Sequence, residues 1–135
     1  MILEWIIGIA TVFCLFMSVR ITIKAFYEQE FMSMETIITV FLFYLSILTG
    51  FAMIYLLLLH GGFDILALHQ HAVKGTYIEL LNHSMYFSAI TIFSVGYGDI
   101  VPVGWGRIIA VTEAMIGYIL PVVIVARTVY GIEKQ

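Results

Sequence analysis

Charge is the scarcest property of this chain. Only 11% of its 135 residues are Asp, Glu, Lys or Arg, against about 25% in an ordinary soluble domain. Hydrophobic residues make up 62%, more than so few polar groups could cover on the surface of a small globule. The formal net charge is −3, so the chain lacks the excess of basic residues that binds nucleic acid. These shortages argue against a soluble enzyme or a nucleic-acid binder and indicate one domain embedded in a lipid bilayer.

Cysteine is nearly absent as well. Cys14 is the single cysteine, so the chain forms no disulfide within itself. The apolar runs contain no Ser/His pair, no paired aspartates and no HExxH, so we expect no enzyme and no organic cofactor. Residues 2–19 lack the basic start and the cleavage site of a secretory signal, and we expect them to be retained.

Long uncharged runs are what the chain has in quantity. Residues 36–59 carry no charge and would form a helix about 36 Å long, which crosses a hydrocarbon core of ~30 Å. Residues 108–126 are interrupted only by Glu113 and also suffice to cross. The first run, 5–19, crosses only if it is extended to residue 27, with Arg20 and Lys24 reaching the headgroups. We expect it to cross, and the alternative is a helix lying at the membrane interface.

One segment between the two long runs is too short to cross. Residues 84–93 are apolar, and Ser-Val-Gly-Tyr-Gly-Asp follows them at 94–99. Glycines at alternate positions permit positive φ, so successive carbonyl groups can be turned to one side. Non-helical backbone at membrane depth is tolerated only where protein buries it or it lines a watery path. The pattern therefore predicts a re-entrant element at a pore, and a ring of such carbonyls needs several copies in closed symmetry.

Residues 91–99, Thr-Ile-Phe-Ser-Val-Gly-Tyr-Gly-Asp, resemble the signature of potassium channels, whereas an isolated Gly-Tyr-Gly would be typical of a turn. The resemblance implies an all-α membrane protein that assembles with three identical subunits into a symmetric homotetramer in the lipid bilayer. Its pore domain would cover 36–130, preceded by an additional N-terminal transmembrane helix over 1–27 and a cytoplasmic connector over 28–35. Within the pore domain we expect an outer helix at 36–60, an outer loop at 61–82, a pore helix at 83–93, a filter at 94–99 and an inner helix at 104–130.

The same resemblance assigns the ion-binding residues. K⁺ would bind to the backbone carbonyls of Ser94, Val95, Gly96 and Tyr97, and Gly98 would complete the filter. The Ser94 hydroxyl would be the innermost ligand. The family usually has threonine there, and serine keeps the hydroxyl without the methyl that limits its rotamers.

Filter support is expected from Asp99, Tyr86 and Thr91. Some bacterial relatives pair this aspartate with a pore-helix glutamate, but Ile90 stands at the matching position. Tyr86 lies where many relatives carry a tryptophan that bonds the aspartate. We therefore predict a Tyr86–Asp99 hydrogen bond as the brace of the filter.

The inner helix carries the expected bend and one charge. Gly117 matches a position where inner helices bend, and a site of close helix packing is an equal alternative. Pro121 predicts a kink. Glu113 would either concentrate cations near the cavity or be a protonated or hydrogen-bonded group behind the filter, bound to Thr91, Ser94 or Ser88; the second interpretation is preferred.

The distribution of basic residues predicts the orientation. The family's filter mouth is extracellular, which puts Lys74 and Arg107 outside and places the C-terminus in the cytoplasm and the N-terminus outside a multi-pass cell-membrane protein. The basic residues that then lie inside outnumber them, as the positive-inside tendency requires: Arg20, Lys24, Arg127 and Lys134. His69 and His71 in the outer loop could bind a metal or sense pH, and solvated loop residues are the preferred interpretation.

The function predicted is passive conduction of K⁺. The alternatives are a weakly selective cation channel and a non-conducting regulatory subunit. A steep voltage sensor is not expected, since Arg20 and Lys24 are only two charges at a helix end.

Overall fold

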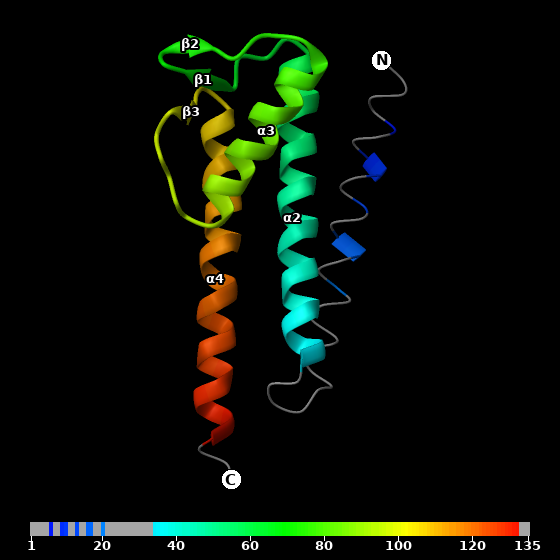
Figure 1. The fold of residues 1–135 in the computed structure, drawn as a ribbon, viewed down its shortest axis with the longest axis vertical. Coiled ribbons are helices and arrows are strands. Elements are labelled where there is room, and N and C mark those ends of the chain that lie inside the picture. Colours follow the sequence, from blue (N-terminus) through cyan, green and yellow to red (C-terminus); the bar gives the residue numbers. More distant parts are fainter. Residues whose placement is uncertain are drawn as a thin grey trace.

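The computed structural model describes residues 34–132, except the side chains of 34–37, 124 and 127–132, together with seven residues nearer the N-terminus. Within 34–132 it has three helices and three short strands (Figure 1). In chain order they are α2 (Met34–His60), β1 (Leu66–Leu68), β2 (His71–Ala72), α3 (Tyr77–Ile92), β3 (Ile100–Pro102) and α4 (Gly106–Ile132).

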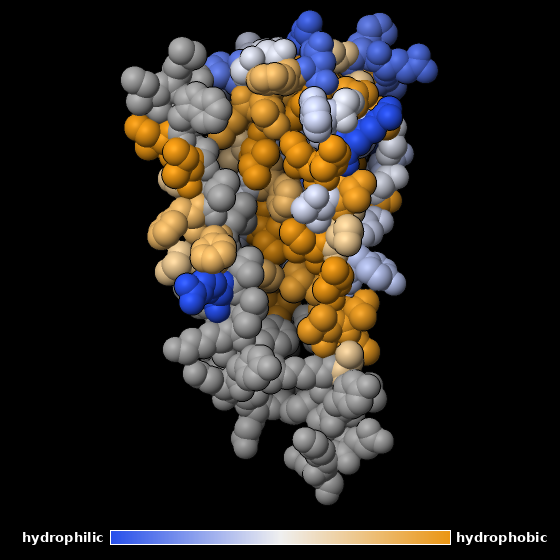
Figure 2. Space-filling model, turned by 180° about the vertical axis from the view of Figure 1, so that it is seen from behind, coloured by the Kyte–Doolittle hydropathy of each residue, from blue (hydrophilic) through white to orange (hydrophobic). Residues whose placement is uncertain are grey.

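The two long helices form the frame of the molecule. α2 and α4 run side by side in opposite directions, and the sheet lies at the end where α2 finishes and α4 starts (Figure 1). Ile38–His60 and Gly106–Val123 are each long and apolar enough to cross a membrane. Figure 2 shows hydrophobic residues over the middle of the molecule and hydrophilic ones near the sheet end. Two helices of the expected length and apolar character are thereby confirmed for the described part of the chain.

Helix α3, the expected pore helix, packs obliquely against both long helices (Figure 1). The buried residues Leu80, Ser84 and Phe87 follow one another at spacings of four and three, so one face of α3 is turned inward. The opposing residues come mainly from α2, and together they form the core of the molecule. The largest fully buried apolar members of this core are Tyr55, Leu56, Leu66 and Ile92.

The boundaries of all three helices differ from the expected ones. α3 begins at Tyr77, not at 83, because Thr76 caps it: the Thr76 N–H and hydroxyl both donate to Oε2 of Glu79, at 2.7 and 3.0 Å. α2 takes in Met34 and residue 35, which were expected in the connector. α4 begins at Gly106 because Gly104 has φ +51° and cannot continue a helix, and it runs two residues past the expected end at 130.

The expectation of an all-α fold is also corrected, since the structure is mostly helical with a small antiparallel sheet in the order β2-β1-β3. Ala67 on the central strand pairs with Ala72 on one side and with Val101 on the other. His69 and Gln70 turn the hairpin with φ +48° and +69°. Such two-residue turns usually contain glycine or asparagine, so His69 and Gln70 do not predict a hairpin.

The N-terminal run is described at Ile6, Ile9, Ala10, Phe13, Phe16, Met17 and Arg20. All seven are helical and exposed. The rest of the predicted helix over 1–27 and the connector residues 28–33 lie outside the described residues. A crossing by this segment therefore stays a prediction.

Candidate functional site

The filter segment, residues 94–99, begins by capping the pore helix. The N–H of Ser94 donates to the Thr91 carbonyl at 3.0 Å. The N–H groups of Val95 and Gly96 both donate to the Ile90 carbonyl, at 2.9 and 3.2 Å. Carbonyls that the end of α3 leaves unpaired are thus satisfied by the filter backbone. These bonds tie the position of the segment to the end of the helix.

The backbone of the filter segment alternates in conformation. Ser94, Gly96 and Gly98 have φ of +55°, +56° and +78°, whereas Val95 and Tyr97 between them keep negative φ. Alternation between right- and left-handed residues turns successive peptide groups to one side of the chain. Within 34–132, no backbone hydrogen bond reaches the carbonyls of 94–98. The segment therefore offers a row of unpaired carbonyl oxygens, which is the ligand type that hard cations prefer.

Ser94 is the only non-glycine residue of this row with left-handed φ. A β-branched residue is strongly strained at such φ, and serine is not β-branched. Serine in place of the usual threonine is thus compatible with the backbone seen here.

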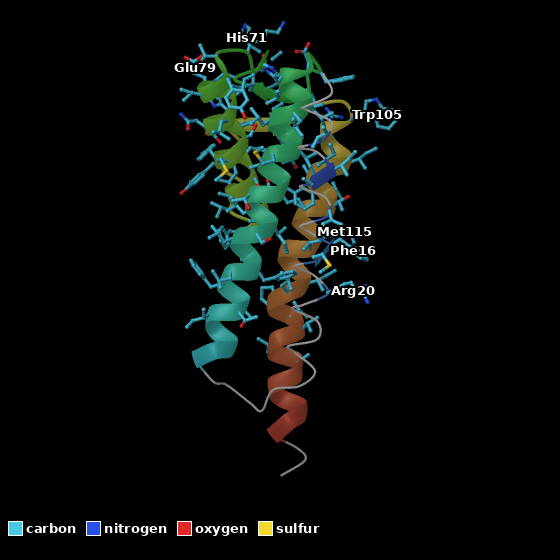
Figure 3. All side chains as sticks on the ribbon, turned by 90° about the vertical axis from the view of Figure 1, so that its right-hand side faces the viewer. Phe16, Arg20, His71, Glu79, Trp105 and Met115 are labelled. Atoms are coloured by element: carbon cyan, nitrogen blue, oxygen red, sulfur yellow. The ribbon has the colours of Figure 1, made fainter. Side chains whose placement is uncertain are left out.

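The side chains of the filter segment have little to pack against in a single chain. Tyr97 is 74% exposed and Val95 51%, and Phe93 just before them is 58% exposed. Trp105, at 77%, points away from the helices (Figure 3). Large apolar groups with this exposure are typical of surfaces that a further molecule covers.

Asp99 and Tyr86 are brought together at the end of the filter segment. A hydrogen bond from the Tyr86 hydroxyl holds the pKa of the Asp99 carboxyl below its usual value of 3.8, although partial burial opposes this shift. The same carboxylate raises the pKa of Tyr86. Oδ1 of Asp99 is buried without a hydrogen-bond partner in the described part of the chain, so the tyrosine serves only one side of the carboxylate. The backbone N–H of His69 approaches the Asp99 carbonyl at 3.5 Å.

Thr91 contacts the filter segment through its backbone rather than its side chain. Its hydroxyl donates to the Phe87 carbonyl one turn earlier in α3, at 2.7 Å. Its own carbonyl receives the Ser94 N–H. The structure therefore does not bring the Thr91 hydroxyl to the filter.

Glu113 lies in the core between the three helices. It is fully buried, its Oε2 accepts a hydrogen bond of 2.8 Å from the Tyr55 hydroxyl, and its Oε1 is hydrogen-bonded to Ser88. Ser88 was one of the three partners expected for it, whereas in the described part of the chain Thr91 and Ser94 form no hydrogen bond with its carboxyl group. Tyr55 was missed, because a tyrosine within an apolar span gives no indication of which helix its hydroxyl will face.

Gly117 is a point of close contact in this structure. A Cβ added there would lie 2.0 Å from the Ile92 carbonyl oxygen, so only glycine lets α4 approach the end of the pore helix. The Tyr44 hydroxyl donates to the Gly117 carbonyl at 3.0 Å, and the Tyr44 ring stacks on Phe93 at 5.7 Å. Of the two interpretations of Gly117, this geometry favours close packing. Pro121 lies inside α4, which continues past it.

Comparison with known proteins decides the family. The sequence profile of a family described as "Ion channel" matches residues 1–132. The chain belongs to this ion channel family. Protein LctB of Geobacillus stearothermophilus is 40% identical to the channel over 104 residues, which are 77% of the channel and 78% of that relative. Protein LctB of Bacillus caldotenax is 42% identical over 99 residues, 73% of the channel and 74% of that relative.

These comparisons establish an ion channel and leave its ion unnamed. Neither relative's name states what it transports. No solved structure matches the channel significantly. Family membership and the two apolar helices identify the channel as a membrane protein. The choice of ion must therefore be argued from the filter segment.

Proposed function

We propose that this channel conducts K⁺ selectively and passively, as a homotetramer of four identical chains. The observation that carries the proposal is the alternating φ at Ser94, Gly96 and Gly98, which presents a row of unpaired carbonyls. Four such rows around one axis would replace the hydration shell of K⁺. The ligands would be the carbonyls of residues 94–97, with the Ser94 hydroxyl as the innermost.

Fourfold assembly is supported by what one chain lacks. A single filter segment supplies one side of a ring, and the exposed Val95 and Tyr97 side chains need a neighbour to cover them. The remaining apolar surface of the long helices suits contact with neighbouring chains or lipid. We further propose that the sheet end, with the filter mouth, is extracellular and that the C-terminus is cytoplasmic in the cell membrane, because this puts most basic residues inside. Family membership favours transport over catalysis, and no enzymatic step is proposed.

Reversal potentials test the choice of ion. Purified channel in planar bilayers, with K⁺ on one side and Na⁺ on the other, is expected to reverse near the K⁺ equilibrium potential. A reversal near zero would indicate a weakly selective cation channel. Tetramers that pass no current under any gradient would indicate a regulatory subunit. Native mass measurement of the same sample should find four chains per particle.

Gly96→Ala tests the filter geometry directly. Alanine at φ +56° costs about 1–2 kcal/mol per chain, and the backbone relieves this by turning carbonyls away from the row. We expect loss of K⁺ selectivity or of conduction. Gly104→Ala is the matched control, because Gly104 has φ +51°, an equally open surrounding and a place outside the filter. Equal effects of the two variants on selectivity would contradict the proposal.

A further inference from the structure

Three helices meet at one buried polar cluster. We name it the three-helix cluster. It consists of the side chains of Tyr55 on α2, Ser88 on α3 and Glu113 on α4, together with the backbone carbonyl of Leu48 on α2. All three side chains have a relative exposure of 0%. The cluster lies behind the pore helix, where the filter carbonyls play no part.

The number of oxygen–oxygen contacts in the cluster can be compared with the number of protons available for them. Tyr55 Oη meets Glu113 Oε2 at 2.8 Å, Ser88 Oγ meets Glu113 Oε1, and Ser88 Oγ meets the Leu48 carbonyl oxygen at 2.9 Å. Each of these three contacts joins two oxygens, so each needs one proton between them. Tyr55 and Ser88 supply one proton each. The third can come only from the carboxyl group of Glu113.

The direction of each bond follows from this count. The Leu48 carbonyl can only accept, so the Ser88 hydroxyl donates to it. Ser88 then has no proton left for Oε1, and Glu113 must donate to Ser88. Tyr55 donates to Oε2. With a protonated Glu113, every contact of the cluster is a hydrogen bond.

An ionised Glu113 fits the same geometry poorly. One Ser88 proton would have to serve both the carboxylate and the Leu48 carbonyl. The carboxylate would then keep one full hydrogen bond, from Tyr55, in a core where both of its contacts are hydroxyl groups and neither is a cation. A buried charge without a paired cation is costly, and more so at membrane depth.

We propose that Glu113 is a neutral, protonated carboxylic acid that positions the pore helix, by joining α3 to α2 through Ser88 and to α4 through its own backbone. Ser88 lies two residues before Ile90, whose carbonyl holds two filter N–H groups. The cluster therefore fixes the rotation and depth of the helix end from which the filter starts. Glu113 is a positioning residue here and does not contact the ion.

This inference deepens the proposed function and rests on it only for its effect on selectivity. The protonation itself is measured without conduction, by infrared spectroscopy of the full channel in lipid at neutral pH. A protonated carboxylic acid has a carbonyl band separate from that of carboxylates, and the band shifts in D₂O. We expect such a band in the unmodified channel and its loss in Glu113→Gln. The matched control is Glu79→Gln, since Glu79 is an exposed carboxylate whose pKa is lowered by Thr76, and it should leave the band in place.

Tyr55→Phe makes the test independent of whether Glu113→Gln assembles. Removal of the Tyr55 hydroxyl takes a hydrogen bond from the carboxyl group, so the acid band should move to higher frequency. Tyr44→Phe removes a hydroxyl bound to the Gly117 carbonyl, outside the cluster, and should not move the band. A band that is absent from the unmodified channel, or that is insensitive to both Tyr55→Phe and Glu113→Gln, would overturn the proposal.

Conservative replacement separates a neutral acid from a charge. Glutamine can donate to Ser88 and accept from Tyr55 as the neutral acid does, so Glu113→Gln should retain the tetramer's unfolding midpoint and its K⁺/Na⁺ permeability ratio. Glu113→Leu leaves two buried hydroxyls unpaired and should lower the midpoint and the permeability ratio. If Gln and Leu were equally damaging, Glu113 would be needed as a charge and the proposal would be wrong. A selective channel that lacks the acid band would contradict this inference alone, whereas an unselective channel that shows the band would contradict only the proposed function.

Discussion

The two sides of the pore helix differ in how far one chain completes them. Behind α3, Glu113 is fully buried and hydrogen-bonded to Tyr55 and Ser88, which are fully buried as well. In front, the filter carbonyls have no partner within 34–132, and Tyr97 is 74% exposed. Behind α3, side chains form a buried core that contains these hydrogen-bonded groups. In front, one chain leaves backbone carbonyl groups unpaired on an exposed surface.

This difference indicates which parts of the structure a single chain completes by itself. One chain can place its pore helix by itself, because the apolar core and the three-helix cluster lie within it. Under the proposed function, the same chain cannot complete the ring of carbonyls, which would need other copies. Substitutions behind α3 should therefore mainly change stability, and substitutions in the filter segment should mainly change ion binding. The predictions below test that division.

Gly117→Ala should have the largest effect on stability. Its Cβ would lie 2.0 Å from the Ile92 carbonyl oxygen, so α4 must move away from the end of α3, at a cost of about 1–3 kcal/mol per chain. Alanine is the better helix former, so a loss of stability can come only from this contact. Thermal unfolding of the purified channel measures it. At Gly61 the nearest atom is 3.2 Å from an added Cβ, and Gly61→Ala should cost much less. Unchanged stability of Gly117→Ala would show that α4 and α3 are not in this contact.

Ser94→Thr should have an intermediate effect, centred on the ion. Threonine is β-branched and is strained at φ +55°, by about 1 kcal/mol more than serine. We expect a smaller difference between the unfolding midpoints in K⁺ and in Na⁺. Ser46→Thr, within the regular helix α2, should leave this difference unchanged. A larger stabilisation by K⁺ in Ser94→Thr would place residue 94 in a right-handed conformation in the assembled channel.

Tyr86→Phe should have the smallest effect, and one that depends on pH. Tyr86 lowers the folded-state pKa of Asp99, so this carboxylate stabilises the fold above its unfolded pKa of about 3.8, and the contribution is lost as pH falls through the lowered folded value. The difference in unfolding midpoint between the unmodified channel and Tyr86→Phe should be positive at neutral pH and shrink below about pH 4.

Tyr118→Phe is the control for this pH dependence, since Tyr118 is 67% exposed on α4. It should show no such trend. A difference between the unmodified channel and Tyr86→Phe that stays constant across this pH range would mean that Tyr86 does not act through the Asp99 charge. Unchanged ion selectivity in Tyr86→Phe would limit the pair to a role in stability.

Local patterns in the sequence predict the spans and the filter segment, because both depend on neighbours along the chain. An uncharged run long enough to cross predicts α2, and alternate glycines predict the backbone at 94–98. The predicted start of α3 was wrong, since Glu79, Asn82 and His83 resemble loop residues. In the structure, Glu79 accepts a hydrogen bond from the N–H of Thr76, which caps the helix. The hairpin at His69 and Gln70 has no glycine to announce it. Its strands are held by pairing with Val101, more than 30 residues away in sequence.

The sequence by itself determined that this protein belongs in a membrane and where its carbonyl row lies, because hydrophobic length and glycine φ are local properties. Only the tertiary structure decided what surrounds Glu113 and Gly117. Tyr55 and Glu113 are 58 residues apart, and the glycine contact depends on how α4 crosses the end of α3. Such contacts arise from the packing of whole helices, which no short stretch of sequence encodes. One of the few acidic residues of this chain, Glu113, thus carries no charge by our inference.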